Sequence, residues 1–310
     1  MSFARPEIIR PPSEASSYFL PLTSGCSNAS CSFCNFFGSP LRIRPLPEIK
    51  QEIDALALYV GHGVRLSNVA PIVYVIAHSW DGKRIFLQDG DALAYPFGWL
   101  VEVLEHLNRR FPELERIASY ATPQDILRRA PEELKRLKDM KLSILYMGVE
   151  SGDDEVLKYI NKGVESRQMV EAGQRIKKAG MLSSLTVILG LGGVQRSFPH
   201  AQSTAKILSQ ADPDFAGALT LTLVPGSPLY DQSQKGAFKL ISPLQSLREL
   251  QTIVRETSFS NCFFSSMHAS NYFSVRGRLP RDKARILAEL EMVISRDDPG
   301  LLRPEFLRGL

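Results

Sequence analysis

Short apolar runs alternate with amphipathic helical patterns along most of the chain, and this alternation is the strongest constraint on its fold. The runs "RIFLQ" from Arg84 and "LSILYMGVE" from Leu142 are each followed by a stretch with hydrophobic residues at helical spacing. Strands that alternate with helices of about ten to fifteen residues predict parallel β-α units. We count about six units up to Tyr230, beginning with a strand in "SSYFLPLTSG". The sequence therefore predicts an α/β fold, a partial (β/α)6 barrel of the TIM type.

The pattern divides the chain into three regions. We expect an N-terminal arm over 1–16, the barrel core over 17–230, and a helical C-terminal extension over 231–310 that caps the barrel. The segment 65–80 is ambiguous, because its β-branched run favours a strand whereas its length and flanks allow a helix.

Composition excludes several classes of protein. The 310 residues carry a net charge of +4, and the short basic runs lie in helical patterns, so nucleic-acid binding is not expected. No apolar run approaches the ~20 residues of a membrane span, and the amino terminus lacks the apolar core of a signal peptide. The four cysteines do not suggest a secreted disulfide scaffold, so we expect a cytoplasmic protein.

Polar and glycine-rich residues collect where the predicted strands end. In parallel α/β folds the carboxyl ends of the strands converge on one face, where ligands bind. That face would gather the cysteine-rich loop "GCSNASCSFCNFFG" after the first strand and five later groups: Asp89 to Asp91, Ser119 to Thr122, Glu150 to Gly152, Gly190 to Gly193, and Pro225 with Gly226. This coincidence predicts a ligand site.

The cysteine loop places Cys26, Cys31 and Cys34 within nine positions. A disulfide would leave an odd thiol and a strained loop, and structural zinc normally takes four ligands. Core cysteines are not expected in a loop this rich in Ser, Asn and Gly. An iron–sulfur cubane, in contrast, can take three thiolates and keep one iron open to bind a substrate. We therefore expect these cysteines to ligate a cluster.

These features together resemble the radical S-adenosylmethionine (SAM) superfamily. The loop follows the first strand, and the aromatic Phe33 stands just before the last cysteine, as in that superfamily. The CX4CX2C spacing is one residue longer than the commonest form and is similar to the coproporphyrinogen-oxidase-like and methylthiotransferase-like branches. The resemblance extends from about Ser17 to Tyr230.

The resemblance implies a [4Fe–4S] cluster and SAM as cofactors. The "DGD" of Asp89 to Asp91, a divergent match, would meet the methionyl ammonium through its carbonyls, and Glu150 would reach the ribose hydroxyls. Ile188 and Gly190 would pack by the adenine. The full set of cofactor contacts implied in this way is Phe33, Asp89, Gly90, Asp91, Ser119, Glu150, Ser151, Ile188 and Gly190.

The implied activity is reductive cleavage of SAM to a 5′-deoxyadenosyl radical that abstracts hydrogen from a substrate. It requires an electron donor such as flavodoxin or ferredoxin. The substrate is a small molecule or a protein that nothing in the sequence identifies.

Candidate substrate residues lie in the tail, in "SNCFFSSMHASNY". His268, Asn271 and Tyr272 are polar groups between apolar ones; they either act in catalysis or form a structural hydrogen-bond network. Cys262 either quenches a product radical or, as we expect, is a buried inert cysteine. We expect Arg42 and Arg44, soon after the cysteine loop, to lie on the surface rather than on an anionic substrate.

Two other classes of function stay open on the residues alone. A non-catalytic iron–sulfur or zinc module would explain the cysteines but needs no nucleotide pocket. A metal-free α/β enzyme could use Asp89, Asp91 and Glu150 as acids and bases, but would leave the cysteine loop without a role.

Overall fold

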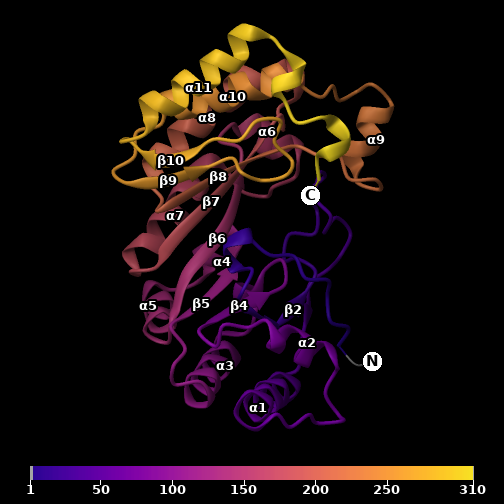
Figure 1. Cartoon of the computed structure of the whole chain (residues 1–310), viewed down its shortest axis with the longest axis vertical. Helices are drawn as coiled ribbons and strands as arrows, with labels where there is room; N and C mark the ends of the chain where they lie inside the picture. The colour runs from indigo at the N-terminus through magenta and orange to yellow at the C-terminus, as the bar shows by residue number, and fades with distance from the viewer. Residues whose placement is uncertain (1–2, 310) are drawn as a thin grey trace. The chain divides into compact units, whose positions relative to one another are not determined.

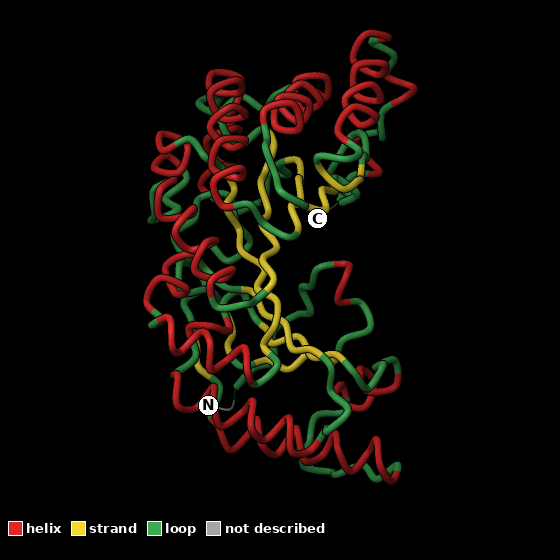
Figure 2. The backbone as a smooth tube through the Cα atoms, turned by 90° about the vertical axis from the view of Figure 1, so that its left-hand side faces the viewer, coloured by secondary structure: helices red, strands yellow, loops and turns green. Residues whose placement is uncertain are grey.

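The computed structural model describes residues 3–309, which form two compact units. The first unit holds residues 3–29, 38–146 and 178–181, and the second holds 30–37, 147–177 and 182–309. Figure 1 labels the elements, and Figure 2 shows strands with helices packed beside them.

The first unit is built on parallel strands in the order β1-β4-β5-β6. Their bounds are β1 (Tyr18–Pro21), β4 (Arg84–Gln88), β5 (Arg116–Tyr120) and β6 (Leu142–Glu150), the last of which continues into the second unit. All four residues of β1 are buried, as expected for a parallel strand covered on both faces. The short strands β2 (Thr23–Ser24) and β3 (Arg42–Ile43) pair antiparallel at either end of the cysteine loop.

The helices of the first unit follow the predicted apolar spacing. They are α1 (Leu46–His62), α2 (Ile72–His78), α3 (Phe97–Arg110), α4 (Pro123–Arg128) and α5 (Pro131–Asp139), with short 3-10 turns at Pro12–Glu14 and Ala92–Ala94. In α3, Leu100, Val103, Leu104 and Leu107 are fully buried, so the apolar spacing that follows the run from Arg84 forms one buried helical face. The ambiguous segment contains the helix α2: Pro71 precedes it, and four of its seven residues are buried despite their β-branched neighbours.

The second unit continues the sheet in the order β6-β7-β8-β9-β10. Its further strands are β7 (Leu182–Leu189), β8 (Phe215–Thr220), β9 (Cys262–Ser265) and β10 (Arg276–Leu279). The pairs β7–β8 and β8–β9 are parallel, and β10 is antiparallel to β9. Burial alternates strictly along β7, so one set of its side chains enters the core and the other does not.

The helices of the second unit are α6 (Asp154–Tyr159), α7 (Ser166–Lys178), α8 (Gly193–Ala211), α9 (Pro228–Gln234), α10 (Pro243–Glu256) and α11 (Lys283–Arg296), with 3-10 turns at Pro299–Leu301 and Glu305–Leu307. A capping box starts α10: the Gln245 N–H donates to Ser242 Oγ, and the Ser242 N–H donates to Gln245 Oε1. Helix α10 packs against both α8 and α11.

The parallel α/β fold is confirmed, and the extension is richer than a set of helices. It holds α10 and α11 as expected, but also β9 and β10, which the sequence pattern did not indicate. Strand β9 extends the parallel sheet and buries Cys262 and Phe264 completely.

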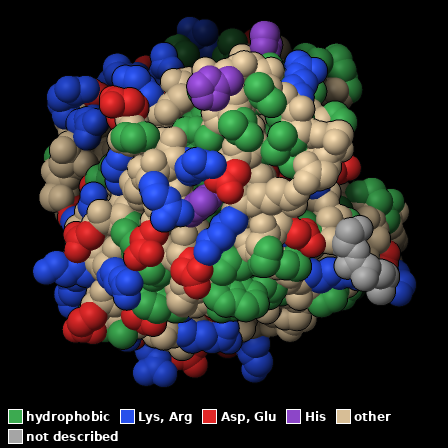
Figure 3. Space-filling model, turned by 90° about the horizontal axis from the view of Figure 1, so that it is seen from below, with side chains coloured by type: hydrophobic (Ala, Val, Ile, Leu, Met, Phe, Trp, Pro, Cys, Tyr) green, Lys and Arg blue, Asp and Glu red, His purple; other side chains and the backbone are tan. Residues whose placement is uncertain are grey.

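Within residues 3–309, no helix is long and apolar enough to cross a membrane. On the face shown in Figure 3, Lys and Arg side chains are interspersed with Asp and Glu side chains.

Candidate cofactor site

The first part of the cysteine loop belongs to the first unit. Gly25 has φ +79°, and a Cβ there would lie 2.6 Å from two backbone carbonyl oxygens, so only glycine fits. Its N–H donates to Asp89 Oδ2 at 3.1 Å, and the Cys26 N–H donates to the Ser39 carbonyl at 3.3 Å. These contacts fix the position from which Cys26 leaves the sheet.

The second part of the loop, with Cys31 and Cys34, belongs to the second unit. Between them, the Ser32 N–H donates to the Ile160 carbonyl and the Ser32 carbonyl accepts from the Leu229 N–H, both at 2.9 Å. The Phe36 N–H donates to Cys34 Sγ at 3.5 Å. Backbone bonds on both sides therefore hold Ser32, the residue after Cys31, and the Cys31 thiol lies 3.9 Å from the Asn161 carbonyl oxygen.

Two features of the loop bear on the cluster that the sequence predicts. All four cysteines are thiols. Burial raises the pKa of Cys31 to about 11, against the opposing charge of Lys162, so its thiolate needs a cation to compensate it. Ser32 Oγ is buried and bonds to no residue of 3–309, which suits a donor to cluster sulfur. Among these described residues no three Cys, His, Asp or Glu side chains are grouped so that they could hold a single metal ion, so the structure does not bring the three thiols together as one metal site.

Two of the predicted cofactor residues, Asp89 and Asp91, lie after β4 and are buried. Burial raises the pKa of Asp89 to about 6, although the Gly25 and Gly90 N–H groups oppose the shift. Gly90, between them, is half-buried.

The Asp91 carboxyl group forms hydrogen bonds with side chains of the protein. Its Oδ2 accepts from Ser27 Oγ at 2.5 Å and from Thr122 Oγ1 at 3.0 Å. Burial, followed by hydrogen bonding with Asp125, raises the pKa of Asp91 well above its usual range, whereas the pKa of Asp125 falls to about 2. Asp91 therefore keeps its proton and ties the residue after Cys26 to α4.

Ser119, on β5, is buried, and its hydroxyl donates to the Tyr120 carbonyl at 2.7 Å. Phe33, in the loop, is half-buried. Neither observation assigns a ligand to these two predicted residues.

The end of β6 carries a buried ion pair that the sequence did not predict. Glu150 has φ +64°, and its Oε1 accepts from Lys162 Nζ at 2.9 Å, with both side chains about nine-tenths buried. A Cβ on Gly148 would lie 2.0 Å from Glu150 Oε1, so this glycine makes room for the carboxylate. One oxygen of Glu150 is thus held, and its direction is fixed.

The buried His200 links Ser151 and Ile188 by hydrogen bonds. The Ser151 hydroxyl donates to His200 Nδ1 at 2.8 Å, and His200 Nε2 donates to the Ile188 carbonyl at 3.1 Å. Burial lowers the pKa of His200 to about 4, so the ring is neutral with its proton on Nε2. This bond pattern joins the ends of β6 and β7.

Gly190 ends β7 with φ +82°, and its N–H donates to Glu249 Oε2 at 2.7 Å. Glu249 comes from α10 and is buried, and burial raises its pKa to about 7. The sequence gives no signal for this residue, because it lies in the extension, 59 positions from its partner.

The tail residues are held by the chain. Asn271 is buried; its Nδ2 donates to the carbonyls of Ala218 and Ser266, and its Oδ1 accepts from Thr220 Oγ1, each at 2.8 Å. These three bonds hold Asn271 within the folded tail.

Tyr272 and His268 are less completely enclosed. The Tyr272 hydroxyl donates to Glu305 at 2.8 Å, and the Arg308 guanidinium lies over the Tyr272 ring. His268 Nδ1 bonds Ser270 Oγ at 2.9 Å, and burial lowers the pKa of its ring.

Two other residues resolve expectations from the sequence. Cys262 is fully buried, and burial raises its pKa to about 12, as expected for an inert cysteine. The surface placement expected for Arg44 is wrong: its guanidinium pairs with the buried Glu52 at 2.8 Å, because the first turns of α1 cover it.

The protein has a parallel α/β fold, and the loop after its first strands holds three cysteines. These two features define an α/β protein with a cysteine-rich loop for a cofactor. Residues 20–199 match the family model of the radical SAM superfamily, and the chain belongs to that superfamily.

Known proteins of similar sequence or fold support this assignment. The chain is 23% identical over 210 residues to the heme chaperone HemW of Bacillus subtilis (strain 168), covering 63% of this chain and 54% of the relative. Coproporphyrinogen III oxidase (HemN) from Escherichia coli, described as a radical SAM enzyme, has a TM-score of 0.53 at 18% identity, covering 77% of this chain and 51% of that one. Methylornithine synthase (PylB) has a TM-score of 0.50 at 18% identity, with coverage of 78% and 63%.

The two solved structures share the partial-barrel α/β fold. The chain spans between 51% and 63% of the length of these three proteins. HemW and HemN fit the coproporphyrinogen-oxidase-like branch that the cysteine spacing resembles. Membership makes the protein an enzyme of a class that uses a [4Fe–4S] cluster and SAM as cofactors.

Proposed function

We propose that this radical SAM enzyme ligates its cluster through Cys26, Cys31 and Cys34 and acts on a small molecule or a peptide. The observation that carries the proposal is the match of residues 20–199 to the superfamily, a range that contains all three cysteines. When bound, the cluster supplies the electron that breaks a carbon–sulfur bond of SAM, giving methionine and a 5′-deoxyadenosyl radical that abstracts hydrogen from the substrate.

The loop residues hold the ligands in place. The two backbone bonds of Ser32 fix the segment between Cys31 and Cys34, and Gly25 sets the direction of Cys26. The Phe36 N–H donates to Cys34 Sγ, and such bonds tune the potential of a thiolate-bound cluster.

The strand ends hold SAM in this proposal. The carbonyls of Asp89 to Asp91 accept from the methionyl ammonium, which leaves their side chains to the contacts already described. Lys162 holds Oε1 of Glu150, and the second oxygen accepts from the ribose hydroxyls. Gly190 offers a surface without a side chain to the adenine, near Ile188.

The tail residues take different parts in the proposal. The three bonds of Asn271 support a positioning role in which it secures the tail. His268 uses Nδ1 within the chain, and we assign its Nε2 to the substrate. Tyr272 lies four residues after His268, and its hydroxyl accepts a hydrogen bond from Arg308 Nη1.

The test is anaerobic purification and reconstitution, followed by iron analysis and incubation with SAM and dithionite. We expect 5′-deoxyadenosine and methionine, and we expect Cys26→Ala, Cys31→Ala and Cys34→Ala to abolish both the cluster absorption and the products. Cys262→Ala is the matched control and should retain both. A protein with a cluster but no cleavage products would be an electron carrier, and a protein without iron would be a metal-free enzyme; either result overturns the proposal.

A further inference from the structure

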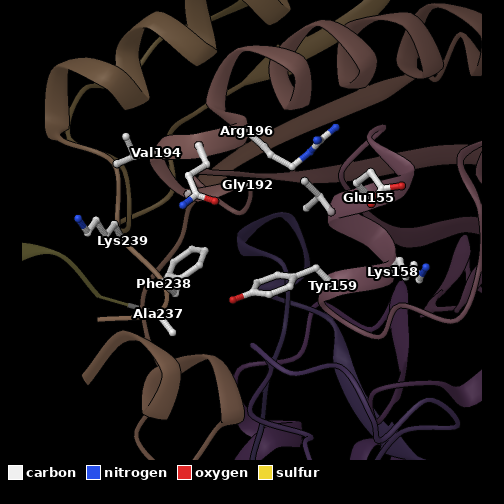
Figure 4. Close-up of a pocket in the computed structure, with 12 residues that line it drawn as sticks. Glu155, Lys158, Tyr159, Gly192, Val194, Arg196, Ala237, Phe238 and Lys239 are labelled. Atoms are coloured by element: carbon white, nitrogen blue, oxygen red, sulfur yellow. The ribbon is translucent and has the colours of Figure 1, made fainter. Parts of the chain in front are cut away.

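A pocket of about 480 Å³ opens in the second unit beside the start of α8. Figure 4 shows the rings of Tyr159 and Phe238 facing one another there; they stack at 6.3 Å between centroids and 21° between planes. Gly192 and Val194 line the side formed by α8. The pocket therefore has an aromatic floor that can receive an apolar side chain.

Apolar groups are exposed around this pocket. Tyr159 and Val194 are each 44% exposed, whereas Phe238 beneath them is only 6% exposed. Exposed apolar groups next to a hollow with a buried aromatic base are typical of protein interaction sites.

Two lysines flank the aromatic pair. Lys158 lies on one side and Lys239 on the other in Figure 4, and both side chains are exposed. A third cation, Arg196, lines the pocket but is neutralised by Asp153, whose oxygens it contacts at 2.9 and 3.0 Å. One acidic side chain, Glu155, also lines the pocket, so the rim carries a positive balance.

Backbone bonds connect the pocket to the cysteine loop. Tyr159 is the last residue of α6, and the carbonyl of the next residue, Ile160, accepts from the Ser32 N–H at 2.9 Å. The Ser32 carbonyl accepts from the Leu229 N–H of α9 at 2.9 Å, and the Tyr159 hydroxyl donates to Gln232 of the same helix. Ser32, the residue after Cys31, is thus bonded both to the residue that follows Tyr159 and to α9, the helix that Tyr159 contacts.

We propose that the surface formed by Lys158, Tyr159, Val194 and Lys239 docks the acidic electron-carrier protein, of the flavodoxin class, that reduces this enzyme. The inference rests on the proposed function, which requires an electron from outside the chain. The reduced carrier gives up one electron, and the sulfonium of SAM takes it up as a carbon–sulfur bond breaks to methionine and the 5′-deoxyadenosyl radical; no proton is needed.

The size and charge of the surface suit such a partner. Electron-transfer encounters bury little area and depend on charge for rapid association. Two exposed lysines around an apolar centre would steer an acidic carrier and let one of its side chains enter the pocket. The Ser32 backbone bonds connect this surface to the cysteine loop, so an electron from a carrier docked here has a short path to the cluster ligands.

The experiment compares two reductants. The double variant Lys158→Glu/Lys239→Glu reverses both rim charges, and Lys206→Glu/Arg255→Glu makes the same charge change at exposed residues that do not line the pocket. Formation of 5′-deoxyadenosine is driven either by reduced flavodoxin or by dithionite, which needs no docking surface. Binding of oxidised flavodoxin to each reconstituted enzyme is measured separately by biolayer interferometry.

We expect the rim variant to lose about tenfold in kcat/KM for flavodoxin and a similar factor in binding at low ionic strength, with a smaller loss in high salt. Its dithionite-driven rate should equal that of the unmodified enzyme. Val194→Asp, an acidic residue tolerated in a first helical turn, should weaken flavodoxin binding in the same direction.

Three results would overturn the docking proposal: unchanged flavodoxin binding in the rim variant, an equal loss in both double variants, or an equal loss with both reductants. If the unmodified enzyme forms no 5′-deoxyadenosine with dithionite, the proposed function fails instead. The binding measurement then still decides whether this surface takes the carrier.

Discussion

Removing the carboxylate of Glu249 tests whether the extension shapes the cofactor pocket. Glu249→Leu deletes the acceptor of the Gly190 N–H, a 2.7 Å bond to a backbone group in a turn with φ +82°. A buried N–H without a partner costs about 1–3 kcal/mol. When the Gly190 turn must keep this conformation to bind the nucleoside, the variant incurs this cost on binding. Its affinity for the nucleoside then drops by about fivefold to about a hundredfold.

Glu249→Gln separates the hydrogen bond from the charge. The amide oxygen still accepts from Gly190, so binding of S-adenosylhomocysteine, measured by calorimetry on the reconstituted protein, should stay close to that of the unmodified chain. Glu256→Gln, on the same helix but exposed, is the matched control. Tight binding by Glu249→Leu, or equal weakening by the Gln and Leu variants, would refute the reasoning.

The same pair predicts a pH dependence with a definite sign. Folding raises the pKa of Glu249 from 4.5 to about 7, so the folded state binds the proton more tightly than the unfolded state does. The free energy of unfolding should therefore fall by about 3 kcal/mol as pH rises from 4.5 to 7 through this group. Glu249→Gln removes that fall, and thermal melts at pH 5 and pH 8 should show a smaller difference than in the unmodified protein.

Three further changes test the rest of the site. Lys162→Met leaves the Glu150 carboxylate buried and unpaired, so the free energy of unfolding should drop by about 3–5 kcal/mol in urea melts at pH 7. Adding Glu150→Leu should restore most of that free energy. A double variant with no restoration would argue against the ion pair. Gly25→Ala meets two carbonyl oxygens at 2.6 Å and should lower the iron content after reconstitution, whereas normal iron content would contradict the fixed path of the loop. Asn271→Leu loses three hydrogen bonds worth about 1 kcal/mol or more each, so its melting temperature should fall. Its 5′-deoxyadenosine formation with dithionite, measured below that melting temperature, should be retained. A variant with normal stability and lost activity would make Asn271 catalytic.

The sequence was sufficient for the elements whose periodicity is long and regular. Strand β7 is a run of eight residues rich in Leu, Val and Ile, and α3 repeats its apolar residues at helical spacing, so both are visible without a structure. Strands β9 and β10 were missed because each has only four residues and polar segments surround them. Their place in the sheet depends on pairing with β8, which local pattern does not encode.

Within the site, the sequence indicated the residues at the strand ends but not their partners. Lys162, His200 and Glu249 reach Glu150, Ser151 and Gly190 across 12, 49 and 59 positions, and only the folded chain brings them together. The pairing of Arg44 with Glu52 was hidden for a related reason: a charged residue next to a polar loop is usually exposed, and its burial depends on how α1 packs.

The most direct test of the central claim is the electron paramagnetic resonance spectrum of the reduced, reconstituted protein with and without SAM. A cluster held by only Cys26, Cys31 and Cys34 keeps one iron open, and SAM binding there should change the g values of its signal. A spectrum that SAM leaves unchanged, or a signal that persists when any one of the three cysteines is replaced by alanine, would contradict the account.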